Sequence, residues 1–90
     1  MPEPIWVARL EISSRTVDKL SRAHGLSAAD VRDALVCVAG LRATWDDHPD
    51  RGRRALIELF LNGQRVLAVL YPVQDALGDT WNLGSAYRVR

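Results

Sequence analysis

The sequence predicts an α+β domain in which two N-terminal helices pack on one face of a small antiparallel sheet, in the order β-α-α-β-β-β. The first observation is a pair of apolar, β-rich runs in residues 54–71, joined by Asn-Gly at 62–63. Asn-Gly tolerates the two positive-φ positions of a type I′ turn, so it predicts a two-residue hairpin. The second observation is helical periodicity in residues 13–39, and the third is the pair of β-rich runs at 5–12 and 79–89.

The chain is expected to begin with a frayed stretch at residues 2–4 and then a strand at 5–12, which is rich in β-branched and aromatic residues. A short helix over about 15–23 should follow, because a serine at 13–14 can cap its first turn. Gly25 is well placed to end this helix in the left-handed conformation.

A second helix is expected after Ser27, which can act as its cap, with Asp30 completing a variant of the capping box. Its apolar stripe is predicted to continue through Ala39, and Gly40 should stop it. Cys37 would then lie within the helix as an inert buried thiol. This helical hairpin is the natural cover for one face of the sheet.

The remaining chain is expected to form strands joined by polar loops. Residues 41–45 are a candidate short edge strand, and the polar stretch 46–52 should be a loop. Pro72 should end the second hairpin strand, because it has no N–H for the ladder. In the last strand, over 79–89, Gly84 is a candidate β-bulge.

The two-residue turn sets the register of the hairpin, with Leu61 opposite Gln64 and each further pair following outward as far as Arg54 opposite Tyr71. One face is then apolar except at the turn and must be covered, since exposing apolar surface costs about 25 cal/mol per Å². Its residues are Ala55, Ile57, Leu59, Leu61, Val66, Ala68 and Leu70, with Gln64 at the turn. The opposite face mixes polar with apolar residues: Arg54, Leu56, Glu58, Phe60, Arg65, Leu67, Val69 and Tyr71.

Length, charge and cysteine content limit the number of domains, the ligand classes and the cellular compartment that we expect. The 90 residues make one domain, and the net charge of +1 is not a strong signature of nucleic-acid binding, although a local basic patch can still bind phosphate. One cysteine allows no internal disulfide and suits a reducing cytosol. We see no signal peptide and no apolar run of the roughly 18 residues that a membrane span needs, so we expect a cytoplasmic protein. The local positive charges are Arg51, Arg53, Arg54, Arg88 and Arg90.

Several segments together resemble a known family. Residues 19–27, KLSRAHGLS, resemble the Lys/Arg-x-His-Gly-Val/Ile-Ser signature of BrnT-type toxins. Arg54, the GQRVLAVLY strand and the late GDTWNLGSAYR segment are similar to that family's Arg, its Gly-Arg-hydrophobic strand and its closing Ile-Ser-Ala-Arg element. The resemblance runs from about residue 10 to residue 89. The family belongs to the RelE/ParE superfamily, so the resemblance implies a RelE-like fold of two helices on a small antiparallel sheet.

The resemblance implies the toxin of a bacterial type II toxin–antitoxin pair. The implied activity is metal-independent endoribonuclease cleavage of RNA or ribosome-associated mRNA, with no cofactor. The implied partner is a cognate antitoxin, in a dimer or a heterotetramer, covering the same face of the hairpin. Residue by residue, Arg54 and Arg65 match cationic positions, Glu58 lies in the same strand pair and Arg88 follows the Ser-Ala element. Tyr87 stands where the family has Arg.

The candidate catalytic groups have assigned roles and plainer alternatives. Arg54 and Arg65 would hold phosphate, and Glu58 would act as the base or orient Arg65. Alternatively, Glu58 and Arg65 form a structural cross-strand ion pair. The proton donor would be Tyr71, Tyr87 or His48. Alternatively, the two tyrosines are half-buried strand aromatics and His48 is an exposed loop residue. The expected RNA-binding cations are Arg51, Arg53 and Arg88.

Other polar and aromatic residues have structural interpretations. His24 is expected to pack at a helix end. The acidic stretch 46–50 offers hard ligands, but its spacing matches no known cation loop, so no metal site is expected. The tryptophans are expected to be core or interface anchors: Trp6, Trp45 and Trp81.

A second functional hypothesis is a catalytically silent module that keeps the toxin fold and binds a protein, either an antitoxin or an enzyme target. The family's closing-strand arginines are replaced here by Thr80 and Asn82, which favours this alternative. Apolar residues on the face that carries Arg54 and Arg65 favour it as well.

Overall fold

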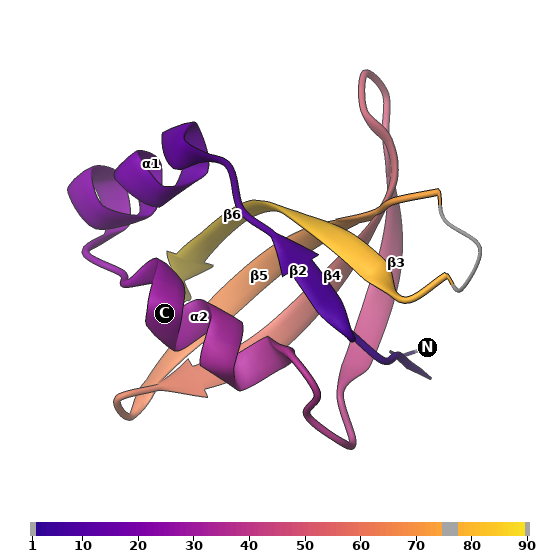
Figure 1. Cartoon of the computed structure of the whole chain (residues 1–90), viewed down its shortest axis with the longest axis horizontal. Coiled ribbons are helices and arrows are strands. Elements are labelled where there is room, and N and C mark those ends of the chain that lie inside the picture. The colour runs from indigo at the N-terminus through magenta and orange to yellow at the C-terminus, as the bar shows by residue number, and fades with distance from the viewer. Residues whose placement is uncertain (1, 75–77, 90) are drawn as a thin grey trace.

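The part of the chain that the structure describes forms a curled six-stranded sheet and two helices (Figure 1). The computed structural model describes residues 2–74 and 78–89. The strands are β1 (Glu3–Pro4), β2 (Arg9–Glu11), β3 (Arg42–His48), β4 (Gly52–Leu61), β5 (Gln64–Pro72) and β6 (Thr80–Arg88). The helices are α1 (Ser14–His24) and α2 (Ala28–Leu35). The α+β prediction is confirmed, and neither helix in the described ranges is long and apolar enough to cross a membrane.

The sheet is mixed, which corrects the prediction of an antiparallel sheet. Its strand order is β1-β3-β4-β5-β6-β2, and β2 runs parallel to β6 while the other neighbours are antiparallel. Residues 3–11 therefore supply both edge strands of the sheet: β1 pairs with β3, and β2 pairs with β6. Five residue steps from Pro4 to Arg9 span at most about 18 Å, so the sheet must curl to bring its edges together.

The N-terminal segment differs from the single strand predicted at 5–12. Glu3 and Pro4 pair with β3 instead of fraying, and Pro4 is tolerated because this is an edge strand. Residues 5–8 cross between the two sheet edges, and Val7 is fully buried beneath them. Only residues 9–11 pair with β6. The strand is split because one segment supplies both edges.

The first helix matches its prediction, whereas the second is shorter than predicted. The Ser13 side chain accepts a hydrogen bond from the Thr16 N–H, and Gly25 ends α1 at φ 62°. Ser27 caps α2 as expected, but the helix ends at Leu35 and not at Ala39. The following Val-Cys-Val run disfavours helix.

Cys37 is exposed outside α2, which corrects the prediction of a buried helical thiol. Its φ is 57°, and its N–H donates to the Val7 carbonyl oxygen at 2.8 Å. A long-range hydrogen bond thus competes successfully with continuation of the helix.

The predicted loop at 46–52 is largely strand. Asp46, Asp47 and His48 belong to β3, and Gly52 opens β4, so that only residues 49–51 form the turn. The first residues of β4 pair with β3 before the ladder to β5 begins at Ala55, so this hairpin extends beyond the rest of the sheet (Figure 1). Its polar composition reflects exposure on both sides rather than a lack of strand structure.

The central hairpin of β4 and β5 confirms the predicted register from Leu61–Gln64 to Ala55–Leu70. Asn62 and Gly63 have φ of 51° and 77°, as the two-residue turn requires. The ladder ends one pair before Arg54–Tyr71, and Arg54 pairs with Asp46 of β3. The residues of the predicted apolar face are buried as expected: Ala55, Ile57, Leu59, Leu61, Val66, Ala68 and Leu70.

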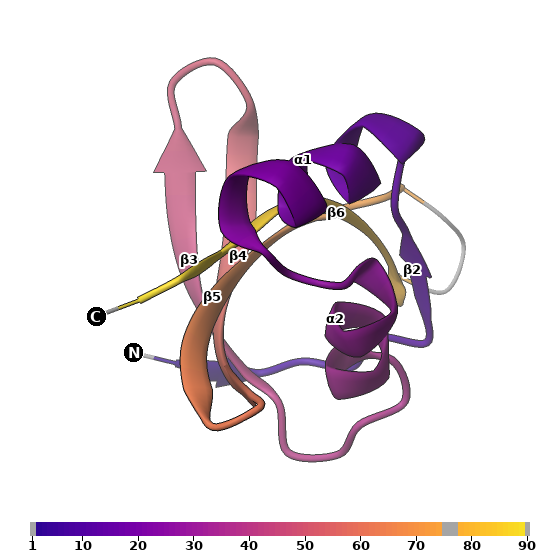
Figure 2. The ribbon, with the colours of Figure 1, turned by 90° about the vertical axis from the view of Figure 1, so that its left-hand side faces the viewer.

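Both helices pack against this buried face, α2 against β4 and α1 against β6 (Figure 2). The side chain of Leu20 from α1 and those of Val31 and Leu35 from α2 are almost completely buried there. The prediction that the helical hairpin covers one face of the sheet is therefore confirmed. The opposite face of β4 and β5, which we call the outer face, carries Arg54, Leu56, Glu58, Phe60, Arg65, Leu67, Val69 and Tyr71.

The predicted bulge at Gly84 is confirmed. Val69 pairs with Ser85 and Leu70 with Leu83, so Gly84 is the extra residue on β6. The Tyr71 ring lies over it, because a Cβ at Gly84 would come within 2.9 Å of Tyr71 Cδ2 and closer still to Cε2. The bulge therefore makes room for an aromatic ring on the outer face.

We predict that Gly84→Ala destabilises the fold by about 1–3 kcal/mol, because the new methyl group overlaps the Tyr71 ring. Urea denaturation of wild type, Gly84→Ala, Tyr71→Ala and the double variant measures the coupling. The cost of Gly84→Ala should nearly vanish when Tyr71 is alanine. An equal cost in both backgrounds would contradict the assigned contact.

Candidate functional site

The outer face brings together the charged residues that the sequence placed there. Arg54, Glu58 and Arg65 all emerge on this side of β4 and β5, and none is buried beneath the helices. Arg54 and Glu58 are four positions apart, which corresponds to about 13 Å along β4. The polar groups therefore form two separate sites rather than one.

The first site is the ion pair between Glu58 and Arg65. The Arg65 Nε donates to Glu58 Oε1 at 2.7 Å, and both side chains are about half exposed. The hydrogen bond from Arg65 lowers the pKa of Glu58, and the same bond raises the pKa of Arg65. Glu58 is thus an ionised but weakened base, and much of the positive charge of Arg65 is already neutralised.

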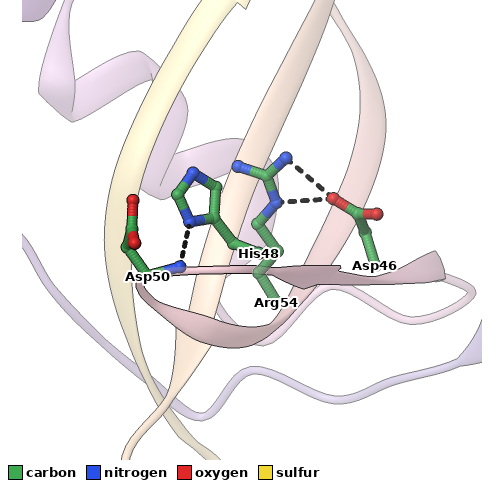
Figure 3. A network of polar contacts seen from close by, with 4 residues as sticks. All are labelled: Asp46, His48, Asp50 and Arg54. Atoms are coloured by element: carbon green, nitrogen blue, oxygen red, sulfur yellow. Dashed lines mark hydrogen bonds and ion pairs between the residues drawn. The ribbon is translucent and has the colours of Figure 1, made fainter.

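The second site, which we call the Arg54 cluster, consists of Asp46, His48, Arg54 and Tyr71. The Arg54 Nε and Nη2 contact one carboxylate oxygen of Asp46 at 2.8 and 2.7 Å (Figure 3). The pKa of Arg54 is raised first by this bond and then by its hydrogen bond to Tyr71. The phenol O–H of Tyr71 is a hydrogen-bond donor near this cation.

His48 joins this cluster from β3. Its Nδ1 accepts a hydrogen bond from the Asp50 backbone N–H at 3.1 Å. The neutral imidazole therefore carries its proton on Nε2. Figure 3 shows the imidazole on the same side of the strands as the Arg54 guanidinium, which lies between His48 and Asp46. A cation and two groups that exchange protons, His48 and Tyr71, are thus gathered at one end of the outer face.

The expected RNA-binding arginines do not share one surface. Arg53 is displaced from Arg54 by one residue and so projects to the opposite side, where its guanidinium carbon lies 4.1 Å from the centre of the Trp45 ring. Arg88 lies opposite Val66, on the covered side, beside Gly25 at the end of α1. Arg51 lies in the turn before β4, near Tyr71.

Tyr87 lies on the outer face but apart from both sites. It pairs with Leu67, which in turn pairs with Glu58, so two strand spacings of about 4.8 Å separate Tyr87 from Glu58. Its ring lies 6.2 Å from that of His24, at the end of α1. His24 therefore packs at a helix end, as the sequence indicated.

Two of the three tryptophans, Trp45 and Trp81, pack near the N-terminal segment, whereas Trp6 is exposed and is not a core anchor. Trp81 is buried, its indole lies 5.8 Å from that of Trp45, and its Nε1 donates to the Trp6 carbonyl oxygen. Trp45 donates to Glu3, while the Trp6 side chain stays exposed. Trp45 and Trp81 thus act as core anchors, in agreement with the structural interpretation.

The acidic side chains of β3 do not point toward one another. Asp46 and Asp47 project to opposite sides of the strand, and the Asp46 carboxylate is engaged by Arg54. Within residues 2–74 and 78–89, no group of three His, Cys, Asp or Glu side chains is placed to hold a metal ion.

Sequence reasoning missed the role of Asp46 because it assigned that residue to a loop. The signal that would have found it is the alternation of Asp46, His48 and Arg54 around a Pro-Asp-Arg-Gly turn, which predicts a polar hairpin. Comparison of the chain with models of protein families, with curated proteins and with solved structures found no match.

We predict that the pKa of Glu58 lies below its ordinary value of 4.5 and returns toward it in Arg65→Gln. A group with a depressed folded-state pKa contributes stability above its unfolded pKa, and this contribution is lost as the pH falls through the folded pKa. The stability difference between wild type and Arg65→Gln should therefore shrink in acid. NMR titration of the Glu58 carboxyl carbon measures the pKa. Arg54→Gln is the control: it removes the same charge from the other site and should leave the pKa of Glu58 nearly unchanged. An equal change in the Glu58 pKa in both variants would argue against the ion pair.

Proposed function

We propose that this chain is the toxin component of a bacterial type II toxin–antitoxin system and cleaves RNA in the cytoplasm without a metal ion. The resemblance of its motifs to BrnT-type toxins supports this proposal. The order β2-α1-α2-β3-β4-β5-β6 contains the β-α-α-β-β-β order expected of the RelE/ParE superfamily. A cognate antitoxin would be the partner that covers the outer face.

The observation that carries the proposal is the composition of the Arg54 cluster. Metal-independent cleavage of RNA needs a base for the 2′-hydroxyl proton, a cation for the pentavalent phosphate and an acid for the 5′-oxygen. Arg54 supplies the cation, and Asp46 holds its guanidinium by accepting from Nε and Nη2. His48 and Tyr71 lie beside it and can exchange protons.

In this reaction, the 2′-oxygen attacks the adjacent phosphorus and its proton passes to one of the two proton-transfer groups. The bond from phosphorus to the 5′-oxygen then breaks, and the other group delivers a proton to that oxygen. The products are a 2′,3′-cyclic phosphate and a 5′-hydroxyl. Glu58, about 13 Å along β4 from Arg54, and its partner Arg65 would contact another nucleotide rather than react.

The catalytically silent binding module is the alternative, and one feature favours it. Phe60 is 69% exposed on the outer face, where it lies directly opposite Arg65 and two positions from Glu58. A large exposed aromatic residue is typical of a protein interface. Both Arg54 and Arg65 are also neutralised by carboxylates, as in a structural surface.

Cleavage of a single-stranded RNA in excess EDTA tests the proposed reaction. We expect 2′,3′-cyclic phosphate ends from the RNA and no cleavage of an all-2′-O-methyl copy, because the attacking hydroxyl is absent. Arg54→Gln should slow cleavage by about a hundredfold or more, as for removal of one preorganised charge-stabilising donor. Arg42→Gln removes the same charge from the far end of β3 and should have little effect.

Two results would contradict the nuclease. Cleavage that EDTA abolishes would mean a metal-dependent reaction. Growth arrest in cells producing the chain without an antitoxin, with their RNA intact, would favour the silent module instead.

A further inference from the structure

A cleft of about 490 Å³ lies between α1 and the tip of the β3–β4 hairpin, a size within the usual range for ligand sites. Figures 1 and 2 both show α1 and this tip at the upper end of the molecule. The floor comes from the bulge of β6 and the adjoining end of β5. Its lining residues are Arg15, Thr16, Lys19, Arg51, Tyr71, Asn82 and Gly84.

Positive charge from two separate elements converges on this cleft. Arg15 and Lys19 are four residues apart on α1 and share one face of it, and Arg51 approaches from the hairpin turn. No carboxylate lines the cleft, and within the described residues these three side chains make no ion pair. Like charges at this helical spacing repel one another, so a bound anion would stabilise the arrangement.

Neutral donors and an aromatic ring accompany the charges. Thr16 and Asn82 offer a hydroxyl and an amide, and the Tyr71 ring is set against Gly84, where a side chain would displace it. A phosphate needs the cations and donors, whereas the fixed ring offers a flat surface on which a base can stack. The same residue belongs to the cleft and to the Arg54 cluster, because Tyr71 lines the cleft and raises the pKa of the nearby Arg54.

We infer that this cleft binds a backbone phosphate of single-stranded RNA and stacks the attached base on Tyr71. The identification of RNA rests on the proposed function. A single strand fits because its bases are free to leave the stack, whereas the bases of a duplex are not. The cleft thereby positions the nucleotide next to the one that the Arg54 cluster would cleave, using cations that carry no carboxylate partner.

Equilibrium binding of an all-2′-O-methyl single-stranded oligonucleotide tests the inference without cleavage. We expect Arg15→Gln/Lys19→Gln and Arg51→Gln each to weaken binding by about tenfold or more, as for loss of charge-assisted hydrogen bonds. The slope of log affinity against log salt should fall by about 0.7 for each lost contact. Arg42→Gln is the matched control and should retain wild-type affinity. All four positions are exposed, so the variants should fold, which circular dichroism checks.

Competition identifies the ligand. Inorganic phosphate, a nucleoside monophosphate and oligoglutamate should each displace the oligonucleotide at least tenfold less well than unlabelled RNA does. Equal competition by the monophosphate would reassign the cleft to free nucleotides, and equal competition by oligoglutamate to acidic protein; either result overturns the inference. So would unchanged affinity of the cleft variants, or a wild type that binds no RNA. If the protein binds unmodified RNA without cleaving it, the nuclease is rejected and the RNA-binding cleft stands. If the wild type cleaves RNA and the cleft variants bind RNA as tightly as the wild type, the nuclease stands and the RNA-binding cleft is rejected.

Discussion

The strict alternation of side chains along the β4–β5 hairpin is the constraint on which the rest of the structure depends. The Asn62-Gly63 turn sets the register, and a slip by one residue would move every core side chain of one strand to solvent. With Leu59 and Val66 directed inward, the helices must cover that side. Glu58 and Arg65 then face away from the helices, and their ion pair forms across the strands at 2.7 Å.

Features set by neighbouring residues could be predicted from the sequence, and features set by distant contacts could not. The hairpin register, the caps of both helices and the bulge at Gly84 follow from local conformational preferences. The end of α2 depends on the bond from Cys37 to Val7, thirty positions away, and the strand character of Asp46 depends on pairing with Arg54. The residues next to Cys37 or Asp46 in the sequence do not indicate these distant partners.

In the candidate site too, features set by neighbouring residues could be predicted and features set by distant contacts could not. Alternation correctly placed Arg54, Glu58 and Arg65 on one face, because strand periodicity is a local property. The cross-strand pair of Glu58 and Arg65 was among the alternatives that the sequence left open, and the structure contains it. Alternation did not reveal that Asp46 holds Arg54, or that α1 contributes to a cleft beside Tyr71. That cleft exists because the last strand bulges and because α1 runs along the edge of β6 beyond β2, which is a consequence of the topology.

Thiol labelling of single cysteines tests the alternation most directly, in a Cys37→Ser background that removes the exposed native thiol. Cysteines placed at Phe60 and Arg65 should react in the native state at rates close to those of the unfolded chain. Cysteines at Leu59 and Val66 should react only as fast as the domain opens, because these positions face the covered side. Equal protection at all four positions, or fast labelling at Leu59 and Val66 alone, would contradict the register and with it the outer face.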